Sequence, residues 1–323
     1  SQLEKKGAED TKNKVKILNK QFEGLEAKVN DKISKKEAVT LLRQLNALED
    51  SYAHLQIEAT DDNAKAIKKK IKNISGERAK LVEIVKQKLK SDVEGCAKKV
   101  SKLKTDLLNP KNIKPSTTIF EDMATIFEDM ATLKEELLEL RREARGNETD
   151  FVFSNYTQLE QYEGNLIQDN LQALQSMITR EGPKSRYNKT IRREWNKNVD
   201  RFNHLDRSKN KPKTSLEGDV RFYTSRVSSL DTKLEDQHLD PALRSSLEEK
   251  RDRAQQEKES AQALLDTFNQ YIESQKAILE EILEKFRETS EQYQEKYDYH
   301  LAEIEKKPQG YSSAPLDVAP SDL

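Results

Sequence analysis

The residues best placed to do chemistry in this sequence are cations interleaved with aromatic side chains. Residues 184–213 hold eleven cations and three acids, and Tyr187, Trp195 and Phe202 lie among them. Cations bind phosphate and carboxylate groups, while aromatic rings can stack on bases. The stretch therefore predicts a site for an anionic partner. The candidate residues are Lys184, Arg186, Lys189, Arg192, Arg193, Lys197 and Arg201.

The spacing of the same stretch supports a second interpretation. Ile191, Trp195, Val199 and Phe202 follow one another at steps of three or four residues, as on the buried face of an amphipathic helix. In that case the aromatic side chains belong to a core, and the cations form its solvated outer face. The spacing favours this second interpretation.

A smaller basic cluster has the same two interpretations. It consists of Lys68, Lys69, Lys70 and Lys72. On a surface helix these cations are simply solvated. They are also candidates for contact with phosphates or with an acidic protein.

A duplicated heptad is the other unusual feature. Thr-Ile-Phe-Glu-Asp-Met-Ala occupies 118–124 and recurs unchanged at 125–131. Seven residues make nearly two helical turns, so both copies place their apolar residues on one face. Methionine beside phenylalanine can form an adaptable docking surface, although buried bundle core is the favoured use. The docking candidates are Ile119, Phe120, Met123, Phe127 and Met130.

Several kinds of chemistry have no basis in the sequence. The nine glycines are too widely separated to form a phosphate-binding loop. The four histidines lack the spacing of metal ligands, and Cys96 is the single cysteine. The abundant carboxylates lie on amphipathic helices, where they form solvated faces and pair with nearby cations. We therefore expect no enzymatic activity, no cofactor and no metal.

The elements that carry these residues are predicted to be helices throughout. All eight prolines fall in apparent linkers, at a helix start or near the end of the sequence. Residues 242–306 contain neither proline nor glycine, and Pro241 suits the first position of a helix. We expect one long helix over 241–306. The fold class is all-α, an elongated helical bundle with two long antiparallel coiled-coil hairpins.

The first hairpin is predicted over residues 1–108 and is net basic. Its arms are one continuous helix of about 10–59 and a second of about 64–108, joined by a turn at 60–63. Ser34 and Glu37 resemble a capping box that would start a new helix, but the length of the returning arm favours continuity.

The rest of the chain is predicted to form a second region. A linker at 109–117 leads into a helical bundle over 118–306, which contains a loop at 147–156 and a helix at about 158–180. The second hairpin covers about 215–264, and its part-exposed seam includes Ala254. A disordered tail is expected at 307–323.

Composition narrows the functional classes. Hydrophobic residues make up 34% and charged residues 36%, with a mean hydropathy of −0.95, as in thin helical bundles. The absence of an apolar run of membrane-spanning length favours a cytoplasmic protein. We expect a non-enzymatic scaffold that holds protein partners at fixed separation in a cytoskeletal, trafficking or assembly role. Membrane binding to anionic lipid and nucleic-acid binding, both through the basic patches, are the alternatives, and homo-oligomers are compatible with each.

Overall fold

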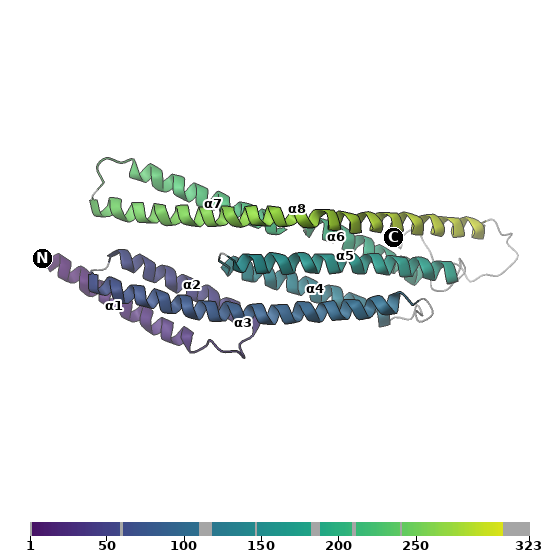
Figure 1. Cartoon of the computed structure of the whole chain (residues 1–323), viewed down its shortest axis with the longest axis horizontal. Helices are drawn as coiled ribbons and strands as arrows, with labels where there is room; N and C mark the ends of the chain where they lie inside the picture. The colour runs from purple at the N-terminus through teal and green to yellow at the C-terminus, as the bar shows by residue number, and fades with distance from the viewer. Residues whose placement is uncertain are drawn as a thin grey trace. The chain divides into compact units, whose positions relative to one another are not determined.

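The chain folds into an all-α helical bundle. The computed structural model describes residues 2–58, 61–109, 118–145, 147–181, 188–208, 211–239 and 241–305. These ranges contain eight helices and no strand, which confirms the predicted fold class at the level of an all-α bundle. The helices are α1 (Gln2–Glu26), α2 (Lys35–Glu58), α3 (Asp61–Leu107), α4 (Thr118–Glu143), α5 (Glu148–Glu181), α6 (Asn188–Ser208), α7 (Lys211–Leu234) and α8 (Pro241–Glu305) (Figure 1).

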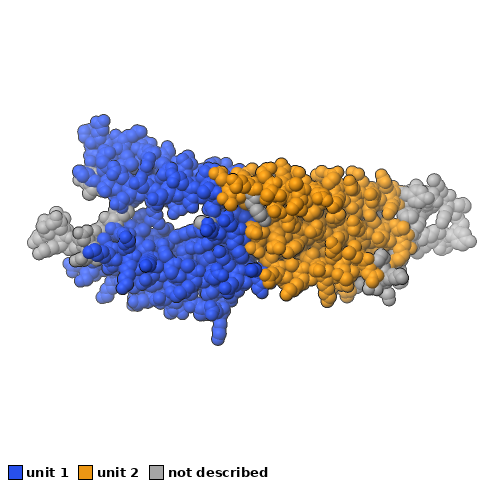
Figure 2. Space-filling model, in the orientation of Figure 1, with its two compact units in different colours: residues 1–92, 135–153, 216–265 blue, residues 93–134, 154–215, 266–323 orange. Residues whose placement is uncertain are grey.

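The helices divide into two compact units, each built from segments distant in sequence (Figure 2). Unit 1 contains residues 1–92, 135–153 and 216–265. Unit 2 contains residues 93–134, 154–215 and 266–323. Each of α3, α4, α5, α7 and α8 contributes one part of its length to unit 1 and another part to unit 2.

The first arm of the chain is two helices, so the prediction of one continuous helix over 10–59 was wrong. The backbone N–H and the hydroxyl of Ser34 donate to Glu37 Oε2 at 3.1 and 2.6 Å, and the Glu37 N–H donates back to Ser34 Oγ at 3.3 Å. This is the capping box that the sequence contained. It satisfies backbone groups at the start of α2, and this local preference overrides the match in arm length that favoured continuity.

The start of α5 also differs from prediction. Residues 148–156 are helical rather than part of a loop, because Val152, Phe153 and Tyr156 are buried at helical spacing. The Glu148 carboxylate accepts a 2.8 Å hydrogen bond from the Arg145 N–H, which fixes the first turn. An apolar cluster that looked like a loop is therefore the first core-facing turn of α5.

The remaining predicted boundaries have mixed outcomes. Residues 61–63 begin α3 instead of forming a turn, while Thr60 lies outside the described residues. The predicted linker at 109–117 is described only at Asn109, and the predicted tail at 307–323 lies wholly outside. The long C-terminal helix is confirmed, with bounds of Pro241 and Glu305.

Helices α7 and α8 run antiparallel within unit 1 and share a small hydrophobic core. Val227 and Leu230 of α7 pack with Ala254 of α8, and Leu247 lies against them. Arg251 Nε donates to Asp231 Oδ1 at 3.0 Å beside this core. Ala254 is buried, while Leu243 of the same seam is 51% exposed, so the expectation of a part-exposed seam holds for the seam but not for Ala254 itself. A short alanine side chain lets α7 approach closely and cover that position.

Candidate interaction surfaces

The inner face of α6 is a packed core surface in unit 2. Trp195 stacks on Tyr293 of α8 with ring centroids 3.9 Å apart. Phe202 stacks on Phe286 of α8 at 4.4 Å. Trp195 is buried and Phe202 is half-buried, so both belong to the α6–α8 contact. The core interpretation of these two aromatic residues is confirmed, while Tyr187 lies outside the described residues.

The outer face of α6 carries a row of exposed cations. Lys189, Arg193 and Lys197 are each four residues apart, so they lie one above another on the same side of the helix. Arg192 is half-buried. We call Lys189, Arg193 and Lys197 the cation row. Of the other candidates from the sequence, Lys184 and Arg186 lie outside the described residues.

A buried carboxylate lies beneath the cation row. Glu194 is 1% exposed, and its Oε1 accepts a 2.8 Å hydrogen bond from Lys197 Nζ. Arg193 Nε lies 3.8 Å from the same oxygen. A buried charge without its partner is costly. Lys197 therefore stabilises α6 in addition to contributing positive charge to its surface.

Arg201 occupies a different environment from the cation row. Its guanidinium lies 4.3 Å from the centroid of the Phe127 ring, and Nη1 lies 4.0 Å from Met123 Sδ and 3.5 Å from Asn198 Oδ1. Burial lowers the pKa of Arg201, and the nearby Glu194 carboxylate opposes that shift. Arg201 thus joins the basic stretch to the duplicated heptad, and most of it is packed against α4.

The duplicated heptad lies mainly in the core of unit 2. Phe120, Met123 and Met130 are buried, whereas Ile119 and Phe127 are partly exposed. Phe127 is partly covered by Arg201. The burial agrees with the core interpretation, and these five side chains do not form an exposed docking groove.

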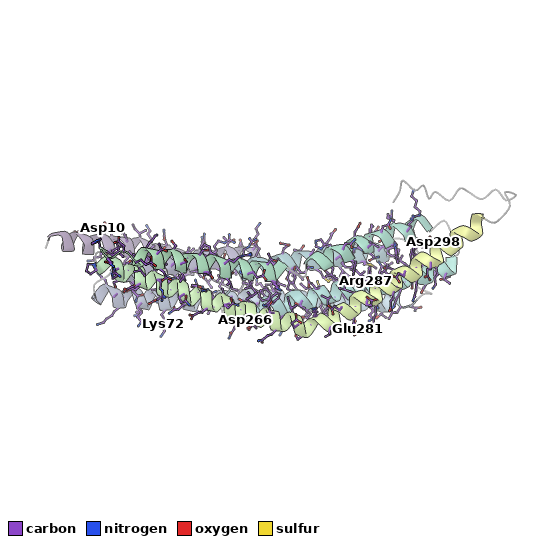
Figure 3. The ribbon with its side chains drawn as sticks, turned by 90° about the horizontal axis from the view of Figure 1, so that it is seen from above. Asp10, Lys72, Asp266, Glu281, Arg287 and Asp298 are labelled. Atoms are coloured by element: carbon purple, nitrogen blue, oxygen red, sulfur yellow. The ribbon has the colours of Figure 1, made fainter. Side chains whose placement is uncertain are left out.

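The smaller basic cluster lies on α3 in unit 1. Lys68, Lys69 and Lys72 are exposed, and Lys72 is labelled in Figure 3. Lys70 is half-buried, with its Nζ 5.5 Å from the centroid of the Phe22 ring. One of the four cations therefore packs against α1, and the other three remain candidates for an anionic partner.

Two ion pairs with buried cations were not identified from the sequence. In unit 1, Arg78 binds both carboxylate oxygens of Glu148 at 2.7 Å. In unit 2, Lys134 Nζ donates to Glu163 Oε2 at 2.9 Å, and both side chains are buried. The partners are far apart in sequence, and nothing distinguishes them there from the many solvated charges.

A groove of about 240 Å³ lies in unit 2, where α5, the start of α7 and α8 meet. Apolar side chains of α8 form its floor, namely Phe268, Ile272, Leu279 and Leu283. Charged side chains of both signs also line it, including Lys213, Lys276, Glu273 and Glu280. The sequence signalled this groove only indirectly, through the apolar residues on several faces of the second half of α8.

The described part of the chain offers no metal centre. No group of three or more histidine, cysteine, aspartate or glutamate side chains in it could hold an ion. Cys96, which is buried, belongs to no such group. None of the described helices has a segment long and apolar enough to cross a membrane.

Comparison with known proteins gives no relative from which a role could be carried over. No protein-family model, no curated protein and no solved structure matches this chain.

Proposed function

We propose that this protein is a cytoplasmic, non-enzymatic scaffold that binds protein partners through the outer faces of its helices. The observation that carries the proposal is the construction of α6. Its aromatic residues and Glu194 face inward, while the cation row faces outward. A rigid helix that presents a row of like charges is a surface for recognition.

An acidic protein surface suits the cation row better than the other anionic partners do. Single-stranded nucleic acids are bound by stacking on exposed aromatic rings, and membrane-surface helices insert apolar side chains. On α6, Trp195 and Phe202 are already stacked against α8. The exposed face of α6 carries Lys189, Arg193 and Lys197.

The scaffold role also draws on the length of α8. This single helix of 65 residues contributes to both units, and one continuous helix can carry separate binding surfaces. We propose that it holds bound partners at a fixed separation, and that α7 and α8 pair as a coiled coil. The antiparallel core of Val227, Leu230 and Ala254 supports that pairing.

The test compares two double variants that remove the same charge. Lys189→Gln with Arg193→Gln alters the cation row, and Lys98→Gln with Lys102→Gln alters exposed lysines of α3. Lys197 is left in place because its loss would leave the buried Glu194 without its closest partner. Both double variants should retain the helicity of the unmodified chain.

The probe is a fluorescent poly-glutamate peptide, titrated at low and at moderate salt. We expect the cation-row variant to bind about tenfold more weakly, since each exposed ion pair contributes up to about 1 kcal/mol. The α3 variant should bind as the unmodified chain does, and binding should weaken as salt rises. Selective binding to acidic vesicles or to duplex DNA would favour an alternative partner. Binding to none of the probes would mean that the cations are a solvated face.

A further inference from the structure

The groove in unit 2 has an apolar floor that the described residues leave partly uncovered. Phe268 and Leu283 are buried, but Ile272 and Leu279 remain partly exposed beside them. Partly exposed apolar side chains between charged rims are the usual arrangement of a peptide-binding groove. The groove therefore fits a short apolar segment.

We propose that residues 315–320 of the same chain occupy this groove. Their sequence is Pro-Leu-Asp-Val-Ala-Pro, and prolines at both ends favour an extended conformation. Side chains alternate along an extended chain, so Leu316 and Val318 point to one side and Asp317 to the other. Two apolar side chains thus face the floor while one carboxylate faces the rim.

The distance from the end of α8 limits which residues can reach the groove. Leu283 lies 22 residues before Glu305, or about 33 Å along the helix at 1.5 Å per residue. Leu316 lies 11 residues after Glu305, and an extended chain of that length spans about 36–40 Å. Val318 reaches about 43–47 Å, which covers the roughly 39 Å back to Leu279. The segment therefore reaches the groove by running back along α8.

The charges of the rim suit an extended peptide. Lys213 and Lys276 can bind the Asp317 carboxylate, and Glu280 can accept a hydrogen bond from a backbone N–H. Leu316 and Val318 each carry such an N–H, whereas Pro315 and Pro320 do not. A rim that carries charges of both signs is therefore complementary to this segment. Its polar groups replace the water that would otherwise hydrogen-bond to the peptide backbone.

Disulfide trapping in the full chain tests the proposal. In a Cys96→Ser background, Val318→Cys is combined with Leu279→Cys, which lines the groove. The matched control combines Val318→Cys with Ile278→Cys, one residue away on α8 and 48% exposed outside the groove lining. Under mild oxidant at micromolar protein, we expect the Leu279→Cys pair to close within one chain at least tenfold faster than the control pair.

Two results would overturn the proposal. One is equal closure rates at the two positions, and the other is a groove-specific disulfide that forms only between chains. Amide hydrogen exchange tests the same contact with variants that change no residue of the groove. Leu316→Asp with Val318→Asp should increase exchange across 268–283, and Ser312→Asp with Ser313→Asp should leave it unchanged. Equal exchange in both variants would also count against the docked segment.

Discussion

The two units each contain an ion pair with a buried cation, and the two pairs are built in different ways. In unit 1, Arg78 holds both oxygens of Glu148 and also donates to Asn46 Oδ1 at 2.8 Å and to the Glu143 carbonyl at 2.7 Å. In unit 2, Lys134 Nζ donates a 2.9 Å hydrogen bond to Glu163 Oε2. A planar guanidinium can satisfy several acceptors at once, whereas an ammonium acts more as a point charge.

The difference appears in the two carboxyl groups. Burial alone would raise the pKa of Glu148, but hydrogen bonds from Arg78 and from the Arg145 N–H outweigh it, so that pKa is lowered. Burial raises the pKa of Glu163, and the attraction of Lys134 does not compensate. Burying a charge is therefore tolerated in two ways: unit 1 satisfies the charge fully, and unit 2 accepts a carboxyl that is easier to protonate.

The largest effect is expected from removing the cation of unit 1. Arg78→Ala leaves the Glu148 carboxylate without its bidentate partner, so we expect a loss of about 3–5 kcal/mol in the free energy of unfolding. Urea denaturation at neutral pH measures it. Arg43→Ala is the control, because Arg43 is exposed while pairing with Glu143, and it should cost less than about 1 kcal/mol. Similar costs for both variants would contradict the comparison.

The packing of unit 2 should matter nearly as much as the ion pair of unit 1. Phe286 is buried and stacks on Phe202, so Phe286→Ala should cost about 3–5 kcal/mol. Ile282, a few residues earlier on α8, is partly exposed, so Ile282→Ala should cost about 1–2 kcal/mol. Thermal or urea unfolding would establish the order. Equal, small losses would show that the α8 contacts contribute little to unit 2.

The ion pair of unit 2 should be the more replaceable one. Lys134→Met combined with Glu163→Leu removes both charges and retains side-chain volume, so we expect a change within about 1 kcal/mol or a gain. Lys134→Met alone should be the less stable variant at neutral pH, because it leaves Glu163 buried without its partner. A double variant as unstable as the single variant would show that the charges themselves are required.

The opposite pKa directions predict opposite pH dependences. The pKa of Glu163 in the folded protein is raised above its ordinary value of 4.5. Its contribution to stability is therefore fully present below pH 4.5 and is lost as pH rises through the folded pKa. Glu148 has a lowered pKa, so its contribution is present above 4.5 and is lost as pH falls through the folded pKa. Relative to the unmodified chain, Glu163→Gln should therefore gain stability as pH rises, and Glu148→Gln should lose it. Urea titrations between pH 3 and pH 8 measure both trends, and parallel curves would contradict them.

The smallest expected effects distinguish how tightly the helices approach in each unit. A Cβ on Gly164 of α5 would lie 3.1 Å from Ile282 Cγ2, whereas one on Gly218 of α7 would meet nothing within 4 Å. Gly218→Ala should stabilise by about 0.5–1 kcal/mol through helix propensity. Gly164→Ala gains the same propensity but crowds Ile282, so the two effects should nearly cancel. A gain at Gly164 equal to that at Gly218 would show that α8 moves aside freely.

The sequence predicted the elements of this fold better than their contacts. Pro241 correctly marked the start of α8, and the spacing of Trp195 and Phe202 correctly placed one face of α6 in the core. Local signals also explain the errors. The capping box at Ser34 was visible but was outweighed by the length of the returning arm, and Val152 and Phe153 were interpreted as part of a loop.

The candidate surfaces were only partly predictable. The exposure of Lys189 and Arg193 follows from the periodicity of α6, but the burial of Glu194 does not, because neighbouring acids such as Asp200 are exposed. The groove depends on the alignment of α5 with α8, for example through a 2.7 Å hydrogen bond from Gln161 to Gln275. Helical periodicity fixes which face of a helix is apolar, but it does not fix which neighbour covers it or how far along.

The duplicated heptad of α4 raises the question of how a helix selects its register. A shift of α4 by seven residues along its neighbours would replace each apolar side chain of the second copy by the identical one of the first. Even an ion pair survives the exchange, because Asp122 would take the place of Asp129, which accepts from Lys99 at 2.7 Å. Neither the apolar repeat nor this surface pair distinguishes the two alignments.

The buried charge next to the repeat does distinguish them. After the same shift Phe127 would occupy the position of Lys134, and Glu163 would be buried against a phenyl ring. A polar group in a core can fix alignment in this way at some cost in stability. Lys134 and Glu163 form the weaker of the two ion pairs, yet they single out one alignment of α4 where the repeat itself allows two.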